Sequence, residues 1–277
     1  MTANLTAIIL TCNEELNVPH AIKSVSGWAK DVFVLDSGST DETVKQSEEL
    51  GAKVFYNKFE NYSKQRNYAL TQLPVTTEWI LFLDADEYLM EELKEEIAIE
   101  IEKKNAKDAY QIKYRLIWME KWIKRGYYPT YLLRLVKRSK TICEERAVNE
   151  HLIVDGEIGY LENDIIHEDR KGIISWSSKH LKYIQMEADE LCKDFDEDEY
   201  VNISFWGNQA ERRRWLRYRV WGRMPRFVRP FLYFIYRYFI NRGFLDGKEA
   251  FIFHFLHGCW FPFMIDCVDL EKEQRKK

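Results

Sequence analysis

Two aspartates with one alanine between them offer the clearest chemistry in this sequence. Asp84 and Asp86 directly follow the apolar run Trp79–Leu83, whose large side chains are typical of a strand buried on both faces. Ligands of open α/β sheets bind at the carboxyl ends of strands, and strand alternation would point both carboxylates to one side. Without His or Cys close by, such oxygen ligands favour Mg²⁺ or Mn²⁺, shared with the phosphates of a substrate. An acidic helix N-cap is the alternative, because a helical pattern starts at Glu87.

Three further strands are predicted ahead of this motif, and each precedes a helical pattern. The strands are expected at residues 5–10, 31–35 and 51–56, and the helices at 17–29, 43–50 and 61–73. The second strand closes on Asp36, so polar groups would gather at one edge of a mostly parallel sheet wrapped by helices. Because the sequence has no G-x-G-x-x-G or G-x-x-x-x-G-K-S/T motif in this region, neither a dinucleotide site nor a P-loop is expected.

The composition is that of a globular protein with one large domain or two small ones. Of the 277 residues 46% are hydrophobic and 31% charged, and the net charge of −4 hides an acidic stretch at 186–200 and a basic one at 212–242. Five cysteines are scattered without a C-x-x-C pair, which argues against disulfides or zinc and favours a reducing compartment. The N-terminus lacks a charged leader and a long apolar core, so a cytoplasmic address is expected.

Four motifs in order carry a resemblance to a known family. They are Thr11–Glu15 (TCNEE), Val34–Thr43 (VLDSGSTDET), Gln65–Ala69 (QRNYA) and Leu83–Glu87 (LDADE). This series resembles that of the family 2 inverting glycosyltransferases, and most closely the bacterial branch that includes the lipopolysaccharide core β-1,4-glucosyltransferases. The resemblance implies an α/β fold of the GT-A type, with a Rossmann-like, mostly parallel sheet, flanking helices and a nucleotide-sugar donor.

The resemblance also implies a set of donor and metal residues. In it Asp36 meets uracil or ribose, Asp84 faces ribose and metal, and Asp86 binds Mg²⁺ or Mn²⁺ directly, with His167 as an additional candidate ligand. Lys64 and Arg66 would contact the diphosphate, although a solvated helix face also explains them. The full set of donor-binding candidates is Thr11, Asn13, Glu14, Asp36, Lys64, Arg66, Asp84 and Ala85.

Glu150 is the candidate catalytic base, because the segment Ala147–Leu152 resembles the family segment that carries the catalytic carboxylate. An inverting transfer is a single displacement, so one group must take the proton from the acceptor hydroxyl. The branch usually has His before this glutamate, whereas this chain has Asn149 there and His151 after it. A pairing of Glu150 with Arg146 is the structural alternative.

A basic and aromatic segment supplies candidate acceptor contacts. Aromatic faces suit the apolar side of a sugar, and Lys or Arg suits phosphates. The candidates are Trp122, Lys124, Arg125 and Arg134, with Gly126 and Pro129 as turn markers between the predicted strands 109–118 and 131–137. An ordinary β-connection with core-anchoring tryptophans explains each of these residues singly.

The C-terminal third interleaves arginine with aromatic residues. Residues 212–242 hold ten arginines and no Asp or Glu, a pattern that fits either single-stranded nucleic acid or an anionic membrane interface. The apolar segment that follows contains His254, His257, Pro262 and Asp266, which disfavour a true membrane span and favour an interfacial hairpin. We favour the membrane because a lipid-linked acceptor explains it, whereas nucleic acid explains nothing in the first domain. Packing of these helices on the core or on a second subunit of a homo-oligomer is the alternative.

Together the patterns predict three segments, and the resemblance implies one activity. Residues 1–105 would form the donor half of a GT-A domain, 106–200 its acceptor and catalytic half, and 201–277 a helical membrane-associating region. The expected reaction is transfer of a hexose to a glycolipid such as the lipopolysaccharide inner core, at the cytoplasmic face of the inner membrane. Glucose from UDP-glucose is the expected donor. Two rivals are an aspartyl phosphohydrolase and a membrane-surface scaffold with a degenerate nucleotide fold.

Overall fold

The computed structural model describes residues 2–144, 151–191, 206, 212 and 215–275. The chain divides into two compact units, the first made of residues 1–117 and 128–172 and the second of 118–127 and 173–277. The first unit therefore combines the expected donor half with most of the acceptor half. The second unit adds the loop 118–127 and residues 173–200 to the expected C-terminal region.

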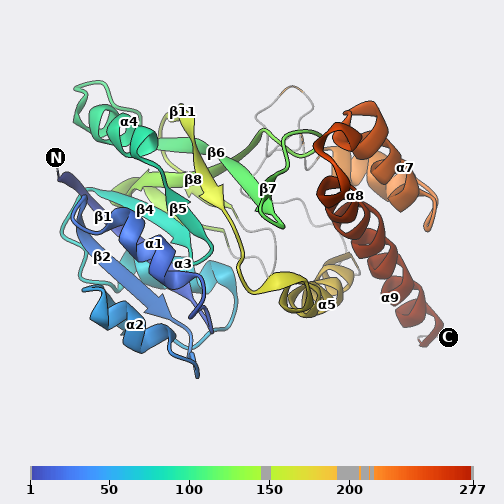
Figure 1. The fold of residues 1–277 in the computed structure, drawn as a ribbon, viewed down its shortest axis with the longest axis horizontal. Coiled ribbons are helices and arrows are strands. Elements are labelled where there is room, and N and C mark those ends of the chain that lie inside the picture. The colour runs from blue at the N-terminus through green and yellow to red at the C-terminus, as the bar shows by residue number, and fades with distance from the viewer. Residues whose placement is uncertain (1, 145–150, 192–205, 207–211, 213–214, 276–277) are drawn as a thin grey trace. The chain divides into compact units, whose positions relative to one another are not determined.

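The first unit is built on a mixed sheet with helices packed against it (Figure 1). Its strand order is β3-β2-β1-β4-β8-β6-β11-β5, and β3, β2, β1 and β4 run parallel to one another. This confirms the expected GT-A type of α/β fold. The main-sheet strands are β1 (Ala3–Thr11), β2 (Ala29–Asp36), β3 (Lys53–Tyr56), β4 (Trp79–Asp84), β5 (Glu87–Leu89), β6 (Ala109–Trp118), β8 (Thr130–Lys137) and β11 (Ile158–His167).

The remaining elements of the first unit are short. The helices are α1 (Val18–Val25), α2 (Thr43–Glu49), α3 (Tyr62–Thr71), α4 (Glu91–Glu102) and the 3-10 turn η1 (Arg138–Lys140), and a small hairpin joins β9 (Thr141–Cys143) to β10 (Leu152–Val154). Helix α3 starts where the sequence predicts, because the side chain of Asn61 accepts a hydrogen bond from the amide of Lys64 at 2.8 Å.

Parallel pairing brings the ends of three strands to one level. Thr11 on β1 is in register with Asp36 on β2, and Leu10 is in register with Asp84 on β4. The carboxylates that close β2 and β4 therefore flank the end of β1, as the sequence predicts for polar strand ends in an open sheet.

Two details of the aspartate motif differ from expectation. Strand β4 ends at Asp84, and Ala85 and Asp86 form a turn, so strand alternation does not orient the two carboxylates. Helix α4 begins at Glu91 with Met90 as its N-cap. The N-cap alternative for the aspartates is therefore wrong, because the strand β5 intervenes.

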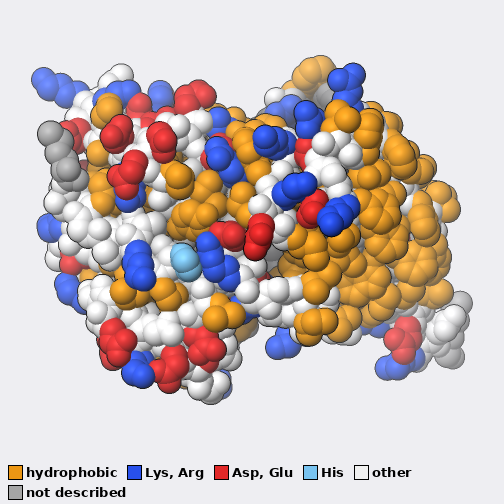
Figure 2. All heavy atoms as spheres, in the orientation of Figure 1, with side chains coloured by type: hydrophobic (Ala, Val, Ile, Leu, Met, Phe, Trp, Pro, Cys, Tyr) orange, Lys and Arg blue, Asp and Glu red, His pale blue; other side chains and the backbone are white. Residues whose placement is uncertain are grey.

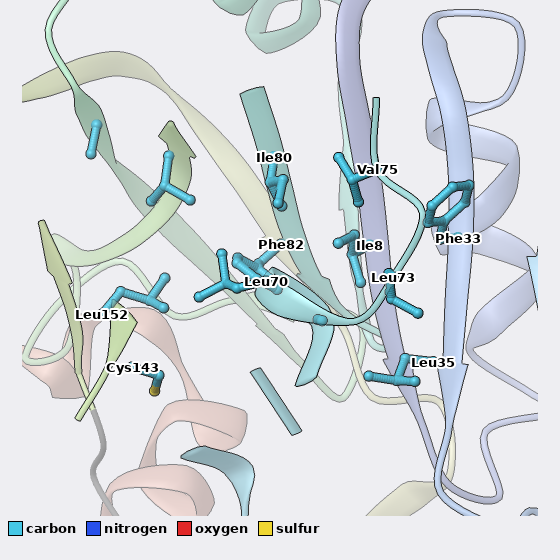
Figure 3. Close-up of a cluster of buried hydrophobic side chains, with 13 residues drawn as sticks. Ile8, Phe33, Leu35, Leu70, Leu73, Val75, Ile80, Phe82, Cys143 and Leu152 are labelled. Atoms are coloured by element: carbon cyan, nitrogen blue, oxygen red, sulfur yellow. The ribbon is translucent and has the colours of Figure 1, made fainter. Parts of the chain in front are cut away.

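One face of the sheet packs against α3 to form a hydrophobic core (Figure 3). Ile8, Phe33 and Phe82 come from the three central strands, and Leu70 of α3 and Leu73 just beyond it cover them. Each of these side chains is at most 4% exposed, and burial of a side chain this large contributes about 2–3 kcal/mol. This core fixes the strands whose ends carry the polar groups.

The second unit consists of helices and the loop 118–127, which contains the short strand β7. Its elements are β7 (Lys121–Trp122), α5 (Gly172–Leu191), η2 (Leu216–Val220), η3 (Trp221–Arg223), α7 (Arg229–Ile235), η4 (Tyr236–Ile240), η5 (Gly243–Asp246), α8 (Lys248–Phe255), η6 (Leu256–Trp260) and α9 (Phe261–Arg275). Among the described residues, one continuous helix, Lys248–Arg275, is long and apolar enough to cross a membrane by length and composition alone.

Buried polar side chains hold the loop 118–127 to these helices. Arg237 is 1% exposed and donates to the carbonyl of Gly126 at 3.0 Å, and Nε2 of His254 lies 3.0 Å from the carbonyl of Arg125. A Cβ on Gly126 would lie 2.4 Å from the carbonyl oxygen of Arg237, and a Cβ on Gly243 would lie 2.7 Å from His254. Glycine is therefore required at both positions for the close approach.

His254 makes the stability of this unit depend on pH. Burial lowers the pKa of His254 to about 4. In the folded chain His254 therefore stays neutral at pH values where it binds a proton in the unfolded chain. Stability therefore falls as the pH drops from about 6.5 toward 4, by roughly 1 kcal/mol between pH 7.5 and 5.5. We expect His254→Gln, which keeps a donor for the carbonyl of Arg125 and cannot titrate, to reduce this loss in urea unfolding at the two pH values.

The comparison variant is His20→Gln, since His20 is exposed on α1 and its pKa is also lowered, by partial burial and by Arg170. This variant should recover less of the stability lost on acidification than His254→Gln does. An equal loss in the His254→Gln protein would show that His254 is not the titrating group.

Candidate active site

The carboxylate of Asp36 organises the loop between β2 and α2. It is 3% exposed and accepts hydrogen bonds from the amides of Gly38 and Ser39, both at 2.8 Å, and from the hydroxyl of Thr11 at 3.0 Å. The hydroxyl of Ser39 adds a fourth bond at 2.5 Å. Two carboxylate oxygens accept about four bonds, so a nucleoside that contacted Asp36 would have to displace one of these donors.

Arg134 places a buried positive charge between two carboxylates. Its guanidinium forms ion pairs with Asp84 and, at 2.5 Å, with Glu87, and the amide of Asp84 donates to Glu87 at 3.0 Å. Arg134 is 4% exposed and Glu87 1%. Burial raises the pKa of Glu87 to about 6, against the opposing effect of Arg134, and the two carboxylates raise the pKa of Arg134 above its ordinary value.

A second guanidinium reaches Asp84 from α3. Nη2 of Arg66 lies 3.4 Å from the other oxygen of Asp84, and the guanidinium carbon lies 6.0 Å from the centre of the Phe82 ring. The neighbouring Gln65 donates to the hydroxyl of Ser37 at 2.8 Å, next to Asp36. Gln65 and Arg66, neighbours on α3, thus reach the ends of β2 and β4 respectively. This explains why the two residues lie together in one motif.

Asp86 lies opposite His167. Strand β5 pairs with β11 so that Glu87 is in register with His167, and this pairing brings Nδ1 of His167 to 3.6 Å from Oδ1 of Asp86. Asp86 is 7% exposed, and no hydrogen bond from any residue that the structure describes reaches its carboxylate. The described part of the chain has no group of three His, Cys, Asp or Glu suited to a metal. A carboxylate with one imidazole fits a cation whose other ligands come from a substrate.

Glu14 belongs to a polar network that joins the first loop to the end of β11. Its carboxylate pairs with Lys171 at 2.5 Å and accepts from Asn17 at 2.8 Å, and Asn17 also donates to Asp169 at 2.9 Å. Burial raises the pKa of Glu14 above its ordinary value, opposed by the hydrogen bonds from Lys171 and Asn17. The network fixes the loop after β1 against the segment that follows His167.

The remaining donor candidates lie on loops at the same edge. Asn13 has a left-handed backbone with φ of 55° and accepts a hydrogen bond from the amide of Thr40 at 2.8 Å. The exposed ammonium of Lys64 on α3 pairs with Glu60, which lies just before the helix. Ala85 is buried in the turn between the two aspartates.

The acceptor candidates belong to different units. Arg134 lies in the first unit and pairs with Asp84, whereas Trp122, Lys124 and Arg125 belong to the second unit. There the amides of Lys124 and Arg125 both donate to Asp246 at 2.7 Å. Glu150 lies outside the described residues.

Sequence patterns predict no role for two buried carboxylates, Glu87 and Glu144. Glu144 is 3% exposed, accepts a hydrogen bond from the amide of His151 at 2.8 Å and lies 2.7 Å from its Nδ1. The available signal for Glu87 was Arg134 itself, because an arginine inside the apolar strand Thr130–Lys137 requires a buried partner. No comparable signal identifies Glu144.

An α/β sheet whose central strand ends present Asp36 and the Asp84–Asp86 motif is the architecture of GT-A glycosyltransferases. Comparison with protein families agrees with this class. The chain belongs to glycosyl transferase family 2, whose family model matches residues 6–155.

Several curated relatives are described as uncharacterised glycosyltransferases of Rickettsia. A protein of Rickettsia bellii is 42% identical over 115 residues, which is 41% of this chain and 38% of that protein. A protein of Rickettsia typhi is 26% identical over 260 residues, 90% of this chain and 80% of that protein. The chain thus spans about two fifths of the length of the Rickettsia bellii protein and of similar proteins of Rickettsia conorii and Rickettsia felis.

Solved structures resemble this chain more distantly. Staphylococcus aureus TarS 1–349 aligns over 71% of this chain and 67% of its own with 19% identity and a TM-score of 0.43. Glucosyl-3-phosphoglycerate synthase of Mycobacterium tuberculosis, solved with Mn²⁺ and UDP-glucose, aligns over 41% of this chain and 44% of its own with 20% identity and a TM-score of 0.36. With both TM-scores below 0.5, these likenesses extend to neither ligand nor reaction.

Removal of Arg134 should destabilise the first unit strongly. Arg134→Met leaves the buried Glu87 without its counter-ion and Asp84 with Arg66 alone, which costs on the order of 3–5 kcal/mol of unfolding free energy. Glu87→Gln in the same protein should recover about 1 kcal/mol or more, because the two sites are coupled. Urea unfolding of both single variants and the double variant measures this coupling.

Lys137→Met provides the control on the same strand, since Lys137 pairs at 3.3–3.5 Å with Asp108 and Glu78 near the surface. Its cost should stay below about 1 kcal/mol. Additive losses in the double variant would show that Arg134 and Glu87 do not act together.

Proposed function

We propose that the protein is a metal-dependent inverting glycosyltransferase. It transfers a hexose, glucose from UDP-glucose being the expected donor, to a hydroxyl of a membrane-borne glycolipid such as the lipopolysaccharide inner core. Family membership supports the reaction class. The observation that carries the metal-dependent mechanism is the buried Asp86 carboxylate, which faces His167 at 3.6 Å beside the end of the central strand.

In this proposal Asp86 and His167 hold Mg²⁺ or Mn²⁺, with the diphosphate completing the ligand set. The bound cation supplies charge neutralisation for the departing UDP. Asp84 already has Arg134 and Arg66 as counter-ions, so it is available to accept hydrogen bonds from ribose without a second cation.

Asp36 and the loop after β1 form the nucleoside end of the proposed site. Asp36 would exchange one of its loop hydrogen bonds for the base or ribose, since the hydroxyl of Ser39 can rotate away at little cost. The network of Glu14 and Lys171 keeps this loop in place when the donor binds. Pre-ordering of this kind lowers the entropic cost of binding.

Glu150 is the proposed general base. It takes the proton of the acceptor hydroxyl as the oxygen forms a bond to the anomeric carbon, and the bond from that carbon to the diphosphate oxygen breaks. UDP leaves with the bonding electrons, and the configuration inverts because only one displacement occurs. The resemblance of Ala147–Leu152 to the family segment supports this assignment.

The acceptor side of the proposal rests on the second unit. Trp122, Lys124 and Arg125 would contact the sugar and phosphate groups of the glycolipid, and Lys124 already lies 4.8 Å from the centre of the Trp122 ring. The expected location is the cytoplasmic face of the inner membrane, where a lipid-linked acceptor and a soluble donor meet.

Donor binding tests the metal site. UDP with Mn²⁺ should raise the melting temperature of the protein, by an amount equivalent to about 2.7 kcal/mol at a hundredfold excess over the dissociation constant. EDTA should remove the part of the shift that depends on metal. Asp86→Asn, which keeps the shape of the side chain, should abolish the Mn²⁺-dependent shift.

Asp31→Asn serves as the control, because Asp31 pairs with Lys53 at 2.8 Å on strands β2 and β3 outside the proposed site. An unchanged Mn²⁺ dependence in Asp86→Asn would remove Asp86 as a ligand. Binding to vesicles without any nucleotide shift would favour the scaffold, and cleavage of p-nitrophenyl phosphate would favour the phosphohydrolase.

Loss of Glu150 should separate binding from transfer. Glu150→Gln should keep the thermal shift with UDP and lower the release of UDP from UDP-hexose by roughly 10²–10⁴-fold, with a lipopolysaccharide truncated at its inner core as acceptor. Asp169→Asn is the comparison, since we take Asp169, two residues beyond His167, as the alternative base. Retained turnover in Glu150→Gln together with loss in Asp169→Asn would transfer the role to Asp169.

A further inference from the structure

The helix formed by α7 and η4 has its polarity reversed with respect to a soluble helix. Its arginines point inward, Arg229 at 5% exposure and Arg237 at 1%. Arg229 pairs with Asp266, which is buried on α9, and Arg237 binds the carbonyl of Gly126. A helix at a water surface normally turns its charges outward and its apolar side chains inward.

The outward side of the same helix is apolar. The exposed positions follow a helical spacing of four residues along two adjacent rows. The exposed large apolar side chains of this helix are Phe231, Leu232, Ile235, Tyr236, Phe239 and Ile240, at 43–66% exposure.

The turn η5 and helix α8 continue this surface. Phe244 and Leu245 are 45% and 54% exposed, and Phe251 and Phe255 are 45% and 42% exposed one turn apart on α8. Ring contacts join α7 to α8, since the ring centre of Phe234 on α7 lies 6.0 Å from that of Phe251 and 6.1 Å from that of Phe255. Figure 2 shows a broad hydrophobic area over the elements that Figure 1 labels α7 and α8.

This aromatic surface comprises Phe231, Leu232, Ile235, Phe239, Ile240, Phe244, Leu245, Phe251 and Phe255. Thirteen of the twenty-six exposed large hydrophobic residues in the described part of the chain fall between residues 216 and 255. Such a concentration is unusual for a surface in water, where contiguous apolar patches are small, and it marks an interaction surface.

Basic side chains accompany the aromatic surface. Arg242 directly follows η4, Lys248 begins α8, and Arg219 and Arg223 precede α7; all four are exposed. None of the four forms an ion pair with a residue that the structure describes. The nearby acids are already neutralised, because Asp246 pairs with Arg125 and Glu249 pairs with Lys121.

We propose that the aromatic surface docks into the interface of an anionic lipid bilayer. Its apolar side chains enter the boundary between headgroups and acyl chains, and Arg219, Arg223, Arg242 and Lys248 contact anionic headgroups. A second copy of the chain is the poorer partner, since a symmetric contact would bring the same positive charges together.

The geometry favours docking over spanning. Two polar residues of the helix Lys248–Arg275 would oppose insertion into a bilayer, and both, His254 and Asp266, are fully buried within the unit. Of the most apolar 18-residue stretch of this helix, only 33% is buried. The helix therefore uses one side for protein contacts and offers the other to lipid. This inference rests on the proposed function for its link to a glycolipid acceptor, but vesicle binding tests it without any transfer reaction.

The test is co-sedimentation of the full chain with vesicles of phosphatidylcholine that contain or lack phosphatidylglycerol. The unmodified protein should bind the anionic vesicles at low salt, and high salt should weaken the binding. Replacement of Arg219, Arg223 and Arg242 by Gln should weaken it by about fivefold per charge, roughly a hundredfold in total.

A matched pair of variants isolates the apolar contribution. Phe239→Ser with Ile240→Ser should reduce vesicle binding at least tenfold, whereas Met90→Ser with Ile99→Ser should leave it unchanged. The two pairs are similarly exposed, at 54% and 66% against 48% and 61%. Circular dichroism melting checks that both proteins fold, and the UDP-induced thermal shift reports the first unit independently.

Absence of the unmodified protein from the anionic vesicle pellet at low salt would overturn the proposal, whatever the variants do. Equal binding to neutral vesicles would overturn the role of the basic residues. A chain that is dimeric without lipid, becomes monomeric with Phe239→Ser and Ile240→Ser, and binds vesicles equally well in both forms would identify the surface as a subunit interface.

Discussion

The geometry at the end of β4 depends on the buried guanidinium of Arg134. Asp84 and Glu87 are three residues apart around a tight turn, and two carboxylates this close repel each other in a protein interior unless a cation lies between them. Arg134 supplies that cation from the neighbouring strand, and the amide of Asp84 closes the turn onto Glu87. Asp86 is thereby left as the carboxylate of this turn with no hydrogen bond from the described residues, while Asp84 is neutralised by the protein itself.

The strands and the strand-end polar groups could be predicted from sequence because they depend on local patterns. Apolar runs mark β1, β2 and β4, and each closes on the expected side chain. The ion pair of Arg134 could not be predicted, since it depends on the antiparallel register between β4 and β8, fifty residues apart in the chain. Taken alone, an arginine in a strand fits an acceptor contact equally well. The juxtaposition of Asp86 and His167 likewise follows from the pairing of β5 with β11.

The loop 118–127 shows a different limit of sequence patterns. Its aromatic and basic residues suggested ligand contacts, but much of its polar backbone is bound by the helices that follow in the chain. Asp246 accepts hydrogen bonds from the amides of Lys124 and Arg125. His254 binds the carbonyl of Arg125, and Arg237 binds that of Gly126. Backbone groups in such a loop must find partners, and here side chains more than a hundred residues away provide them. The backbone beside the side chains of Trp122 and Lys124 is thus bound by hydrogen bonds to the helices that follow it.

The C-terminal helices illustrate why hydropathy alone misjudges a membrane surface. His254 and Asp266 in an apolar segment argue against a span when the sequence is read as a line, because each would be costly in hydrocarbon. In the folded unit both face inward, where Arg229 neutralises Asp266 and a backbone carbonyl binds His254. Their cost is therefore met by protein contacts, and the side that remains exposed is more apolar than the average composition implies. A helix of this kind can lie against lipid along one side without crossing the bilayer. In the proposed docking, the buried polar residues therefore restrict the orientation of the helix at the bilayer but do not prevent binding.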